Sequence, residues 1–434
     1  MKFINNLIDI DLKHEDQKHL LINGNNGFAD LVSPGNYALL RKCYNNGSIE
    51  TLESQNPELF HQLLKRGYIV PDVYDENEER MKVCNMIKHR NAIKLRKYCR
   101  VHFLLTYACN FACPYCYEQQ HRSNSRLTTE QVDKIFSLHD NSISDIGFFG
   151  GEPLLPGNKE IMKYIISKAP HATYSIITNG YYLSDFLDIL EQINVVFLQI
   201  TLDGSKEQHN KTRVLSNGDG TYDVILESIK LSVQRGFPTV VRMNISIDNI
   251  EGCIETKKYI EDQEWAKDNL RFDLQPIFQA SHTEHAQLYS TLILNDCEAL
   301  NRNQNLQHLP PISNFLYNGV PLKPIVKACD ADCFYRFYDP CGDVYSCIAS
   351  VGDTRKRIGT YWPKQTWEDN SFLTRDITTI PQCRECKYAL LCGGGCANAV
   401  SPDADIMVTP NCYTIANDIN VTVPTVYRLM RDKE

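Results

Sequence analysis

Six short apolar runs separated by amphipathic segments occupy the middle of the chain, between about residues 100 and 310. Runs rich in β-branched and aromatic residues predict strands, and the longer segments between them carry the apolar spacing of helices. Strands that alternate with helices pack as a parallel sheet with right-handed crossovers. We therefore expect an α/β fold with a partial (β/α)6 barrel. The expected strands are residues 101–107, 146–151, 173–180, 195–204, 239–246 and 270–277.

The segments on either side of this alternation have a different character. Near the N-terminus we expect two short strands around an Asn/Gly-rich turn, a helix that starts near Pro34, and a helix that ends near Gly67 before a further strand. This order suits a winged-helix-like module. From about residue 320 the chain is loop-rich, dense in cysteine and poor in apolar residues of its own. The predicted domains are 1–98, 99–315 and 316–434.

Composition excludes several classes of protein. The net charge is −8, which argues against a nucleic-acid-binding protein. No apolar stretch approaches the ~18–20 residues that a membrane helix needs. The first residues also lack the basic and then apolar pattern of a secretion signal. We therefore expect a cytoplasmic protein with neither nucleic acid nor a membrane as its partner.

Cysteine is the most telling residue type, with 17 copies. Disulfides are rare in a reducing cytoplasm, so clustered cysteines there indicate metal or redox chemistry. Twelve of them fall into groups at 109–116, 329–347 and 383–412. The other five stand alone in apolar or helical contexts and are predicted to be core residues. These five are Cys43, Cys84, Cys99, Cys253 and Cys297.

The first group reads C-x3-C-x2-C, with Cys109, Cys113 and Cys116 following the first expected strand. Three thiolates suit three irons of a four-iron cluster and leave the fourth iron open. A structural zinc site usually has four protein ligands, so the spacing favours a cluster. Zinc or a purely structural role stays open as the alternative.

This motif, with Tyr115 before its third cysteine, resembles the radical S-adenosylmethionine (SAM) family. The resemblance implies that the open iron binds the amine and carboxylate of SAM. It also implies that one electron cleaves SAM to methionine and a 5′-deoxyadenosyl radical, which abstracts a hydrogen atom. The cofactors carry the chemistry, and the protein supplies binding and orientation.

Further segments resemble the family's SAM-binding positions. Gly150-Gly151-Glu152-Pro153 is similar to its GGEP segment, where Glu152 would accept a hydrogen bond from the SAM ammonium. GGEP alone, or Thr178-Asn179-Gly180 alone, could be an ordinary turn, and polar residues at strand ends are common. No catalytic base is assigned. The remaining positions implied by the resemblance are Thr178 and Asn179 before Gly180, Thr201 and Asp203, and Arg213 in HNKTR as a partner of the SAM carboxylate.

The C-terminal cysteines resemble the SPASM extension of radical SAM enzymes that modify peptides. The resemblance implies two auxiliary four-iron clusters, so three [4Fe-4S] clusters in all. Cys341 is predicted to be spare, and two structural zinc sites are the alternative. The implied ligands are Cys329, Cys347, Cys396 and, at a position seen in some members, Cys333 for the first auxiliary cluster, and Cys383, Cys386, Cys392 and Cys412 for the second.

These resemblances predict an oxidoreductase that matures a ribosomal (RiPP) precursor peptide by closing a C–C, C–S or C–O crosslink. Flavodoxin or ferredoxin would supply electrons. The N-terminal module resembles leader-peptide recognition modules, or it is a structural cap. One alternative is an anaerobic sulfatase maturase, but that family usually has Asp where Ile348 follows Cys347. A quinone- or haem-biosynthetic enzyme and a non-catalytic iron–sulfur electron carrier are the others.

Overall fold

The structure is a computed structural model, and it divides into two compact units. The terminal unit combines residues Met1–Lys94, Tyr289–Cys329 and Thr374–Glu434, and the sheet unit combines Leu95–Leu288 and Asp330–Leu373. The predicted boundaries at 98 and 315 stay a prediction. The structure describes residues 1–95 (without the side chains of 93–95), 100–277, 284, 287–288, 290–292, 309–329, 335–368, 374–401 and 403–431.

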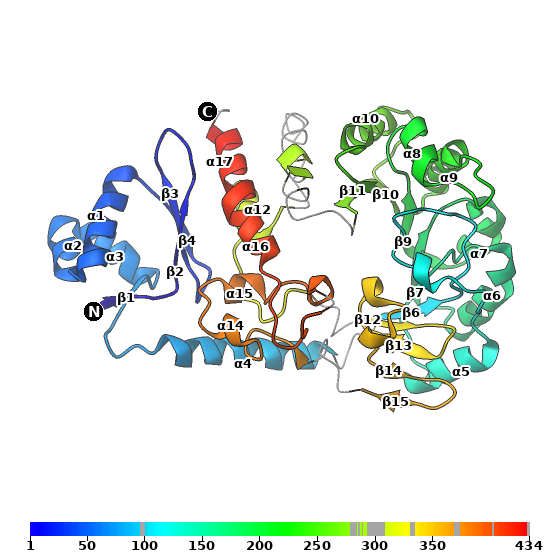
Figure 1. The fold of residues 1–434 in the computed structure, drawn as a ribbon, viewed down its shortest axis with the longest axis horizontal. Coiled ribbons are helices and arrows are strands. Elements are labelled where there is room, and N and C mark those ends of the chain that lie inside the picture. Colours follow the sequence, from blue (N-terminus) through cyan, green and yellow to red (C-terminus); the bar gives the residue numbers. More distant parts are fainter. Residues whose placement is uncertain are drawn as a thin grey trace. The chain divides into compact units, whose positions relative to one another are not determined.

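A large sheet with a parallel majority forms the centre of the sheet unit (Figure 1). Its strands run in the order β11-β10-β9-β8-β7-β6-β12-β13-β14-β15, so the first six are neighbours in sequence order. All six strands expected from the apolar runs are present and pair in parallel. They are β6 (Arg100–Leu104), β7 (Asp145–Phe149), β8 (Thr173–Thr178), β9 (Asn194–Thr201), β10 (Thr239–Ile245) and β11 (Leu270–Pro276).

Helices follow the strands and cover one face of the sheet (Figure 1). Along each strand, side chains alternate between the two faces. On the face toward the helices, Phe103, Phe148, Ile176, Leu198 and Val241 are fully buried. The helices are α5 (Thr129–Leu138), α6 (Lys159–Lys168), α7 (Leu187–Leu190), α8 (Lys206–Thr212), α9 (Tyr222–Gln234) and α10 (Ile250–Glu261).

The opposite face of the parallel sheet is more polar. Ser175, Gln199, Arg242 and Asn244 lie there half-buried, on three neighbouring strands. A doubly covered parallel sheet would carry apolar residues on both faces. This sheet therefore keeps one face for polar contacts.

A later part of the chain extends the sheet beyond β6. Strand β12 (Tyr335–Tyr338) pairs in parallel with β6, and β13 (Asp343–Tyr345), β14 (Gly359–Thr360) and β15 (Thr366–Trp367) follow in antiparallel order. Tyr107 donates its hydroxyl hydrogen to Asp339 Oδ2 at 2.7 Å. The turn between β12 and β13 is thereby tied to the end of β6.

The terminal unit begins with the strands and helices expected near the N-terminus. Its antiparallel sheet consists of β2 (Leu7–Asp11), β3 (His19–Asn23) and β4 (Ala29–Val32), while β1 (Lys2–Phe3) pairs with β5 (Ile69–Val70). Helix α1 (Pro34–Asn46) starts at Pro34, as expected, because Ser33 caps it. Helices α2 (Ile49–Gln55) and α3 (Pro57–Lys65) follow.

One hydrophobic core joins this sheet to the C-terminal helices of the same unit. Ile8, Leu20 and Ile22 pack with Val423 and Val426. The C-terminal part of the chain and the first 30 residues thus share one apolar core. The helices involved are α12 (Pro311–Asn318), α15 (Ala389–Cys392), α16 (Tyr413–Asn417) and α17 (Val423–Arg431).

Helix α4 (Glu76–Leu95) packs against the cysteine-rich segment within the terminal unit. Cys84 and Ile87 share a core with Ile380 and Cys383. Lys88 forms an ion pair with the buried Asp376 at 2.7 Å. In the part of the chain that the structure describes, no helix combines the length and the apolar character that crossing a membrane requires.

Candidate active site

The first cysteine group lies in the loop that follows β6, residues 105–118, called here the cysteine loop. Burial raises the pKa of the Cys109 thiol to about 12, and Glu152 and Cys113 raise it further. Burial also raises the pKa of Cys113, with Cys116 acting in the same direction. Cys113 is therefore a neighbour of both Cys109 and Cys116. Thiols held in this way lose their protons when a metal binds them.

Tyr115 fixes the cysteine loop to the ends of β9 and α8. Its hydroxyl donates to Asp203 Oδ2, and Arg213 Nη1 donates to the same hydroxyl oxygen at 2.7 Å. Asp203 Oδ1 accepts from the backbone N–H of Asn244 at 2.7 Å. Asp203 and Arg213 are 1% and 7% exposed. Tyr115, Asp203 and Arg213 therefore form one hydrogen-bonded network. Thr201, another predicted site residue, is buried at the end of β9.

The GGEP turn, residues 150–153, packs directly onto the cysteine loop. Gly150 and Gly151 have φ angles of 90° and 44°, a left-handed region that favours glycine. A Cβ on Gly151 would lie 2.2 Å from the carbonyl oxygen of Ala108. The Glu152 backbone N–H donates to that same oxygen at 2.9 Å. Gly151 is thus explained by close packing of the two loops, and Gly150 by its positive φ and by the Leu104 side chain, which would lie 2.7 Å from an added Cβ.

Glu152 is buried at 1% exposure and holds the next turn of the site. Its carboxylate accepts hydrogen bonds from Thr178 Oγ1 at 2.6 Å, from the Asn179 N–H at 2.7 Å and from the Leu154 N–H at 2.8 Å. Asn179 Nδ2 in turn donates to Asn110 Oδ1 at 2.8 Å. The Glu152 carboxylate therefore connects the ends of β7 and β8, and Asn179 connects them to the cysteine loop. Burial raises its pKa to about 6.

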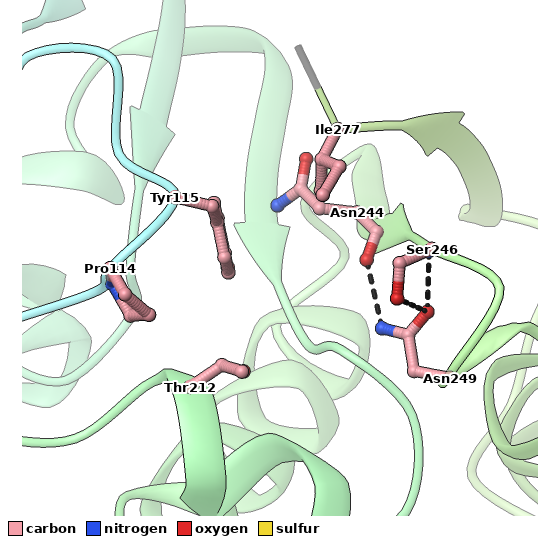
Figure 2. A pocket seen from close by; sticks show the side chains of 7 residues that line it. All are labelled: Pro114, Tyr115, Thr212, Asn244, Ser246, Asn249 and Ile277. Atoms are coloured by element: carbon pink, nitrogen blue, oxygen red, sulfur yellow. Dashed lines mark hydrogen bonds between the residues drawn. The ribbon is translucent and has the colours of Figure 1, made fainter. Parts of the chain in front are cut away.

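A pocket of about 320 Å³ opens beside Tyr115 (Figure 2). Figure 2 shows the cysteine loop on one side and, on the other, residues at and after the ends of β10 and β11. Asn249 braces this second wall, because its Nδ2 donates to the Asn244 carbonyl at 3.0 Å and its Oδ1 accepts from the Ser246 N–H at 2.7 Å. The lining residues are Pro114, Tyr115, Thr212, Asn244, Ser246, Asn249 and Ile277.

Several buried polar atoms around the cysteine loop have no protein partner within the described residues. They are Asn110 Nδ2, Glu118 Oε1 and Arg213 Nε. Buried polar groups are normally paired, so these atoms indicate a polar group that occupies the site. In the same part of the chain, no three His, Cys, Asp or Glu side chains are arranged to hold a single metal ion. The donor set of neighbouring thiols fits a larger iron–sulfur cluster with a polar ligand.

The four cysteines expected to bind the second auxiliary cluster are neighbours in the terminal unit. Burial raises the pKa of Cys383 to about 11, and Cys386, Cys392 and Cys412 raise it further. Arg375 braces the loop that carries Cys392 and Cys396. It is 5% exposed and donates to the carbonyls of Gly394, Gly395, Ile406 and Thr409.

The ligands expected for the first auxiliary cluster are described less completely. Cys329 and Cys396 are exposed, and both influence the pKa of Arg375, which burial lowers. Cys347 is partly buried, Cys333 lies outside the described residues, and Cys341 is exposed. The predicted core residues Cys43, Cys84 and Cys253 are buried. Cys99 and Cys297 also lie outside the described residues.

Sequence reasoning missed several residues that build the site. His209 is fully buried. Its Nδ1 accepts from the Asp203 N–H at 3.2 Å, and its other ring nitrogen bonds Thr221 Oγ1 at 3.0 Å. The HNKTR segment contains His209, so its position next to Arg213 was a usable signal. Asn244 carries no comparable signal, because only the fold brings it to the cysteine loop. Glu118 belongs to that loop, but its hydrogen bond to the Gly151 N–H likewise depends on the fold.

Comparison with known families identifies the central part of the chain. Residues 103–260 match the family model of the Radical SAM superfamily. This segment is a radical SAM domain, and it contains the cysteine loop, the GGEP turn and the network around Tyr115. Such a domain implies one [4Fe-4S] cluster and SAM.

Curated relatives extend over more of the chain. Mycofactocin maturase MftC of Mycobacterium tuberculosis is 24% identical over 320 residues, which cover 68% of this chain and 77% of the relative. A cysteine-type anaerobic sulfatase-maturating enzyme of Clostridium novyi is 25% identical over 337 residues, covering 68% and 86%. The chain is therefore similar to two kinds of maturase.

Solved structures of two other proteins have a similar fold. The anSMEcpe protein with bound AdoMet has a TM-score of 0.60 and 16% identity, covering 77% of this chain and 98% of that one. Streptococcus suis SuiB bound to precursor peptide SuiA has a TM-score of 0.55 and 14% identity, covering 95% and 100%. At these identities the likeness concerns the fold.

Proposed function

We propose that this chain is a radical SAM peptide maturase of the SPASM type. One observation carries the proposal: the cysteine loop, the GGEP turn and the Thr178-Asn179 turn meet at the ends of neighbouring parallel strands, joined through Glu152. Active sites of parallel barrels lie at this end of the strands. The proposal therefore rests on an assembled site as well as on its motifs.

The cysteine loop would hold the first cluster through Cys109, Cys113 and Cys116. With SAM bound, a reduced cluster of this kind supplies the electron that cleaves SAM to methionine and a 5′-deoxyadenosyl radical. The chain's own residues would bind and orient SAM. Arg213 would bind the SAM carboxylate, and the pocket beside Tyr115 has the size range and mixed lining of a small-molecule site.

Two auxiliary [4Fe-4S] clusters complete the proposal. The mutual influence of Cys383, Cys386, Cys392 and Cys412 supports them as one ligand set. The first auxiliary cluster would use Cys329, Cys347, Cys396 and Cys333. Either cluster could accept the electron that an oxidative ring closure releases, and flavodoxin or ferredoxin would reduce the enzyme in the cytoplasm.

The substrate would be a ribosomal precursor peptide, and the product a C–C, C–S or C–O crosslink. The relatives include a maturase that covers two thirds of this chain, and SuiB, with its precursor peptide, shares the fold over nearly the whole chain. The three-stranded sheet and three helices of residues 7–65 support a winged-helix-like module that recognises the leader. Such modules add an extended peptide to a sheet edge.

Formylglycine formation by a sulfatase-maturase-like mechanism is less well supported. That family usually has an Asp base where Ile348 stands. Ile348 packs against an apolar cluster that includes Tyr107, Phe337 and Tyr345. This environment disfavours a charged base at that position.

A triple variant tests the assignment of the active site. Replacing Cys109, Cys113 and Cys116 together by Ala should abolish 5′-deoxyadenosine formation from SAM and dithionite under anaerobic conditions. The iron bound by Cys383, Cys386, Cys392 and Cys412 should remain, because those four thiols lie in the other unit. Retained 5′-deoxyadenosine formation by the triple variant would show that the site is elsewhere.

A further inference from the structure

The terminal unit has a pocket of its own, of about 210 Å³, between α1 and the antiparallel sheet. Buried apolar side chains from three elements line it, among them Leu21 on β3, Leu40 on α1 and Leu63 on α3. Its volume lies below the range of about 300–1,000 Å³ that small-molecule sites have. The pocket therefore suits one bulky apolar side chain better than a whole small molecule.

The sheet edge beside this pocket can accept a further strand. Strand β2 is at one end of the sheet, and its Leu7 and Asp9 line the pocket. The flanking residues Asn6 and Leu12 form backbone hydrogen bonds toward the β3 side. Because this direction alternates along an antiparallel pair, the backbone groups of Leu7 and Asp9 point to the outer edge. Lys387 Nζ donates to the Leu7 carbonyl at 3.4 Å, whereas the Asp9 backbone has no hydrogen-bond partner in the described part of the chain.

The opposite edge of the sheet, at β4, is already in use. Arg66 Nη2 donates to the Ala29 carbonyl at 2.8 Å, and Arg66 Nε donates to Asp30 Oδ2 at 2.6 Å. A peptide strand at this edge would compete with the guanidinium. The β2 edge, with its adjoining pocket, is therefore the better place for one.

The charges around the pocket favour an acidic peptide. Arg41 and Lys387 line it, and neither forms an ion pair within the described residues. The lining carboxylate, Asp9, is already bonded by His19 Nδ1 at 2.8 Å and by the Tyr37 hydroxyl at 2.7 Å. Helix α1 contains no Asp or Glu. The two cations are therefore available to a negatively charged partner.

We infer that an extended segment of the precursor peptide adds to the outer edge of β2 and places a bulky apolar side chain in this pocket. An acidic side chain of the same segment pairs with Arg41 and Lys387. Side chains two positions apart share a face of an extended chain, so the acidic residue stands two positions from the apolar one. The inference rests on the proposed function, which makes a peptide the substrate, and it specifies the edge and the chemistry that hold that peptide.

The test uses a phage-displayed library of random peptides, panned against the anaerobically reconstituted full chain. The enriched peptides are synthesised with a fluorescent label and titrated by fluorescence anisotropy at about 0.15 M salt, where distant charges are screened. They should share a bulky apolar residue with Asp or Glu two positions away. Arg41→Glu should weaken their binding about tenfold, because it removes a charge-assisted contact. Lys42→Glu is the matched control, since it makes the same charge change at an exposed position of α1 outside the pocket lining, and it should bind as the wild type does.

Amide hydrogen exchange locates the bound peptide independently of any variant. The peptide should slow exchange in residues 7–11, where the Asp9 N–H gains a partner. A library that yields no binder, equal affinity of its peptides for wild type and Arg41→Glu, or slowed exchange in residues 29–32 in place of 7–11 would each overturn the inference.

The same preparation also separates the inference from the proposed function. Formation of 5′-deoxyadenosine from SAM and dithionite is measured without peptide. Its absence would contradict the radical SAM activity, whereas the titrations and the exchange data decide by themselves whether a peptide binds at β2.

Discussion

At the residue scale, Glu152 shows how one side chain can organise a site. Its carboxylate accepts three hydrogen bonds, from two turns that follow different strands. A carboxylate can accept all of them, whereas an amide must present N–H groups on one side. The sequence identified Glu152 as important through the GGEP motif. It could not show that the protein's own donors occupy the carboxylate, because those contacts depend on the fold.

Glu152→Gln should therefore destabilise the sheet unit. One of the three donors would face an amide NH2 group and stay unpaired, which costs about 1–3 kcal/mol of the free energy of unfolding. Urea denaturation of the anaerobic protein, followed by circular dichroism, measures this cost against Glu160→Gln, at an exposed carboxylate on α6. Equal denaturation midpoints for the two variants would show that the Glu152 carboxylate does not stabilise the sheet unit in this way.

His209 makes a prediction about pH. Its Nδ1 accepts from a backbone N–H, so the ring is neutral and burial lowers its pKa to about 3. In the unfolded chain the group has a pKa near 6.5. The unfolded state therefore binds the extra proton first as the pH falls, and stability contributed by the neutral ring is lost below about pH 6.5.

His209→Gln removes this titration. The stability difference between wild type and variant should shrink by about 1.4 kcal/mol for each pH unit below about 6. Urea midpoints at pH 7 and pH 5 measure it. Other buried groups, such as His102, titrate in both proteins and cancel. A difference that is the same at both pH values would contradict a neutral buried His209.

At the scale of elements, local sequence patterns correctly predicted the strands of the parallel sheet and two helix ends. All six apolar runs became strands, and Pro34 and Gly67 mark helix ends as expected. The pairing of β12 with β6 was not predictable, because Tyr335–Tyr338 meets Arg100–Leu104 across more than 230 residues with no shared pattern. The docking of α4 onto the cysteine-rich segment escaped prediction for the same reason.

Helix α4 should influence the iron held by the cysteine-rich segment. Arg80 is buried and donates to the carbonyls of Cys383 and Arg384 at 2.5 and 2.9 Å. Arg80→Ala removes both of these hydrogen bonds and a cation beside the cysteines. It should lower the iron content of the triple cysteine variant, in which only auxiliary clusters can form. Lys82→Ala, at an exposed position of the same helix, is the control, and equal iron in both variants would contradict the coupling.

At the scale of the whole molecule, the first and last segments of the chain fold as one unit. Leu20 on β3 is fully buried in the core that also contains Val423, Val426 and Tyr427. Removing residues 1–95 would therefore expose this core. Point variants are the suitable way to separate peptide recognition from folding.

Leu20→Ala tests this shared core. A buried Leu→Ala change costs about 2–5 kcal/mol, and here it should speed amide hydrogen exchange in residues 413–431. Leu31, the cross-strand neighbour of Leu20, is 48% exposed, and Leu31→Ala should leave that exchange unchanged. Slow exchange in 413–431 after Leu20→Ala would mean that the C-terminal helices fold independently of the N-terminal sheet.

The central claim is that the chain is a radical SAM enzyme with three clusters, and one anaerobic experiment tests it most directly. The protein is reconstituted with iron and sulfide, its iron, sulfide and zinc are counted, and SAM and dithionite are added. We expect about twelve irons per chain and formation of 5′-deoxyadenosine. Bound zinc with no cleavage of SAM would contradict the claim.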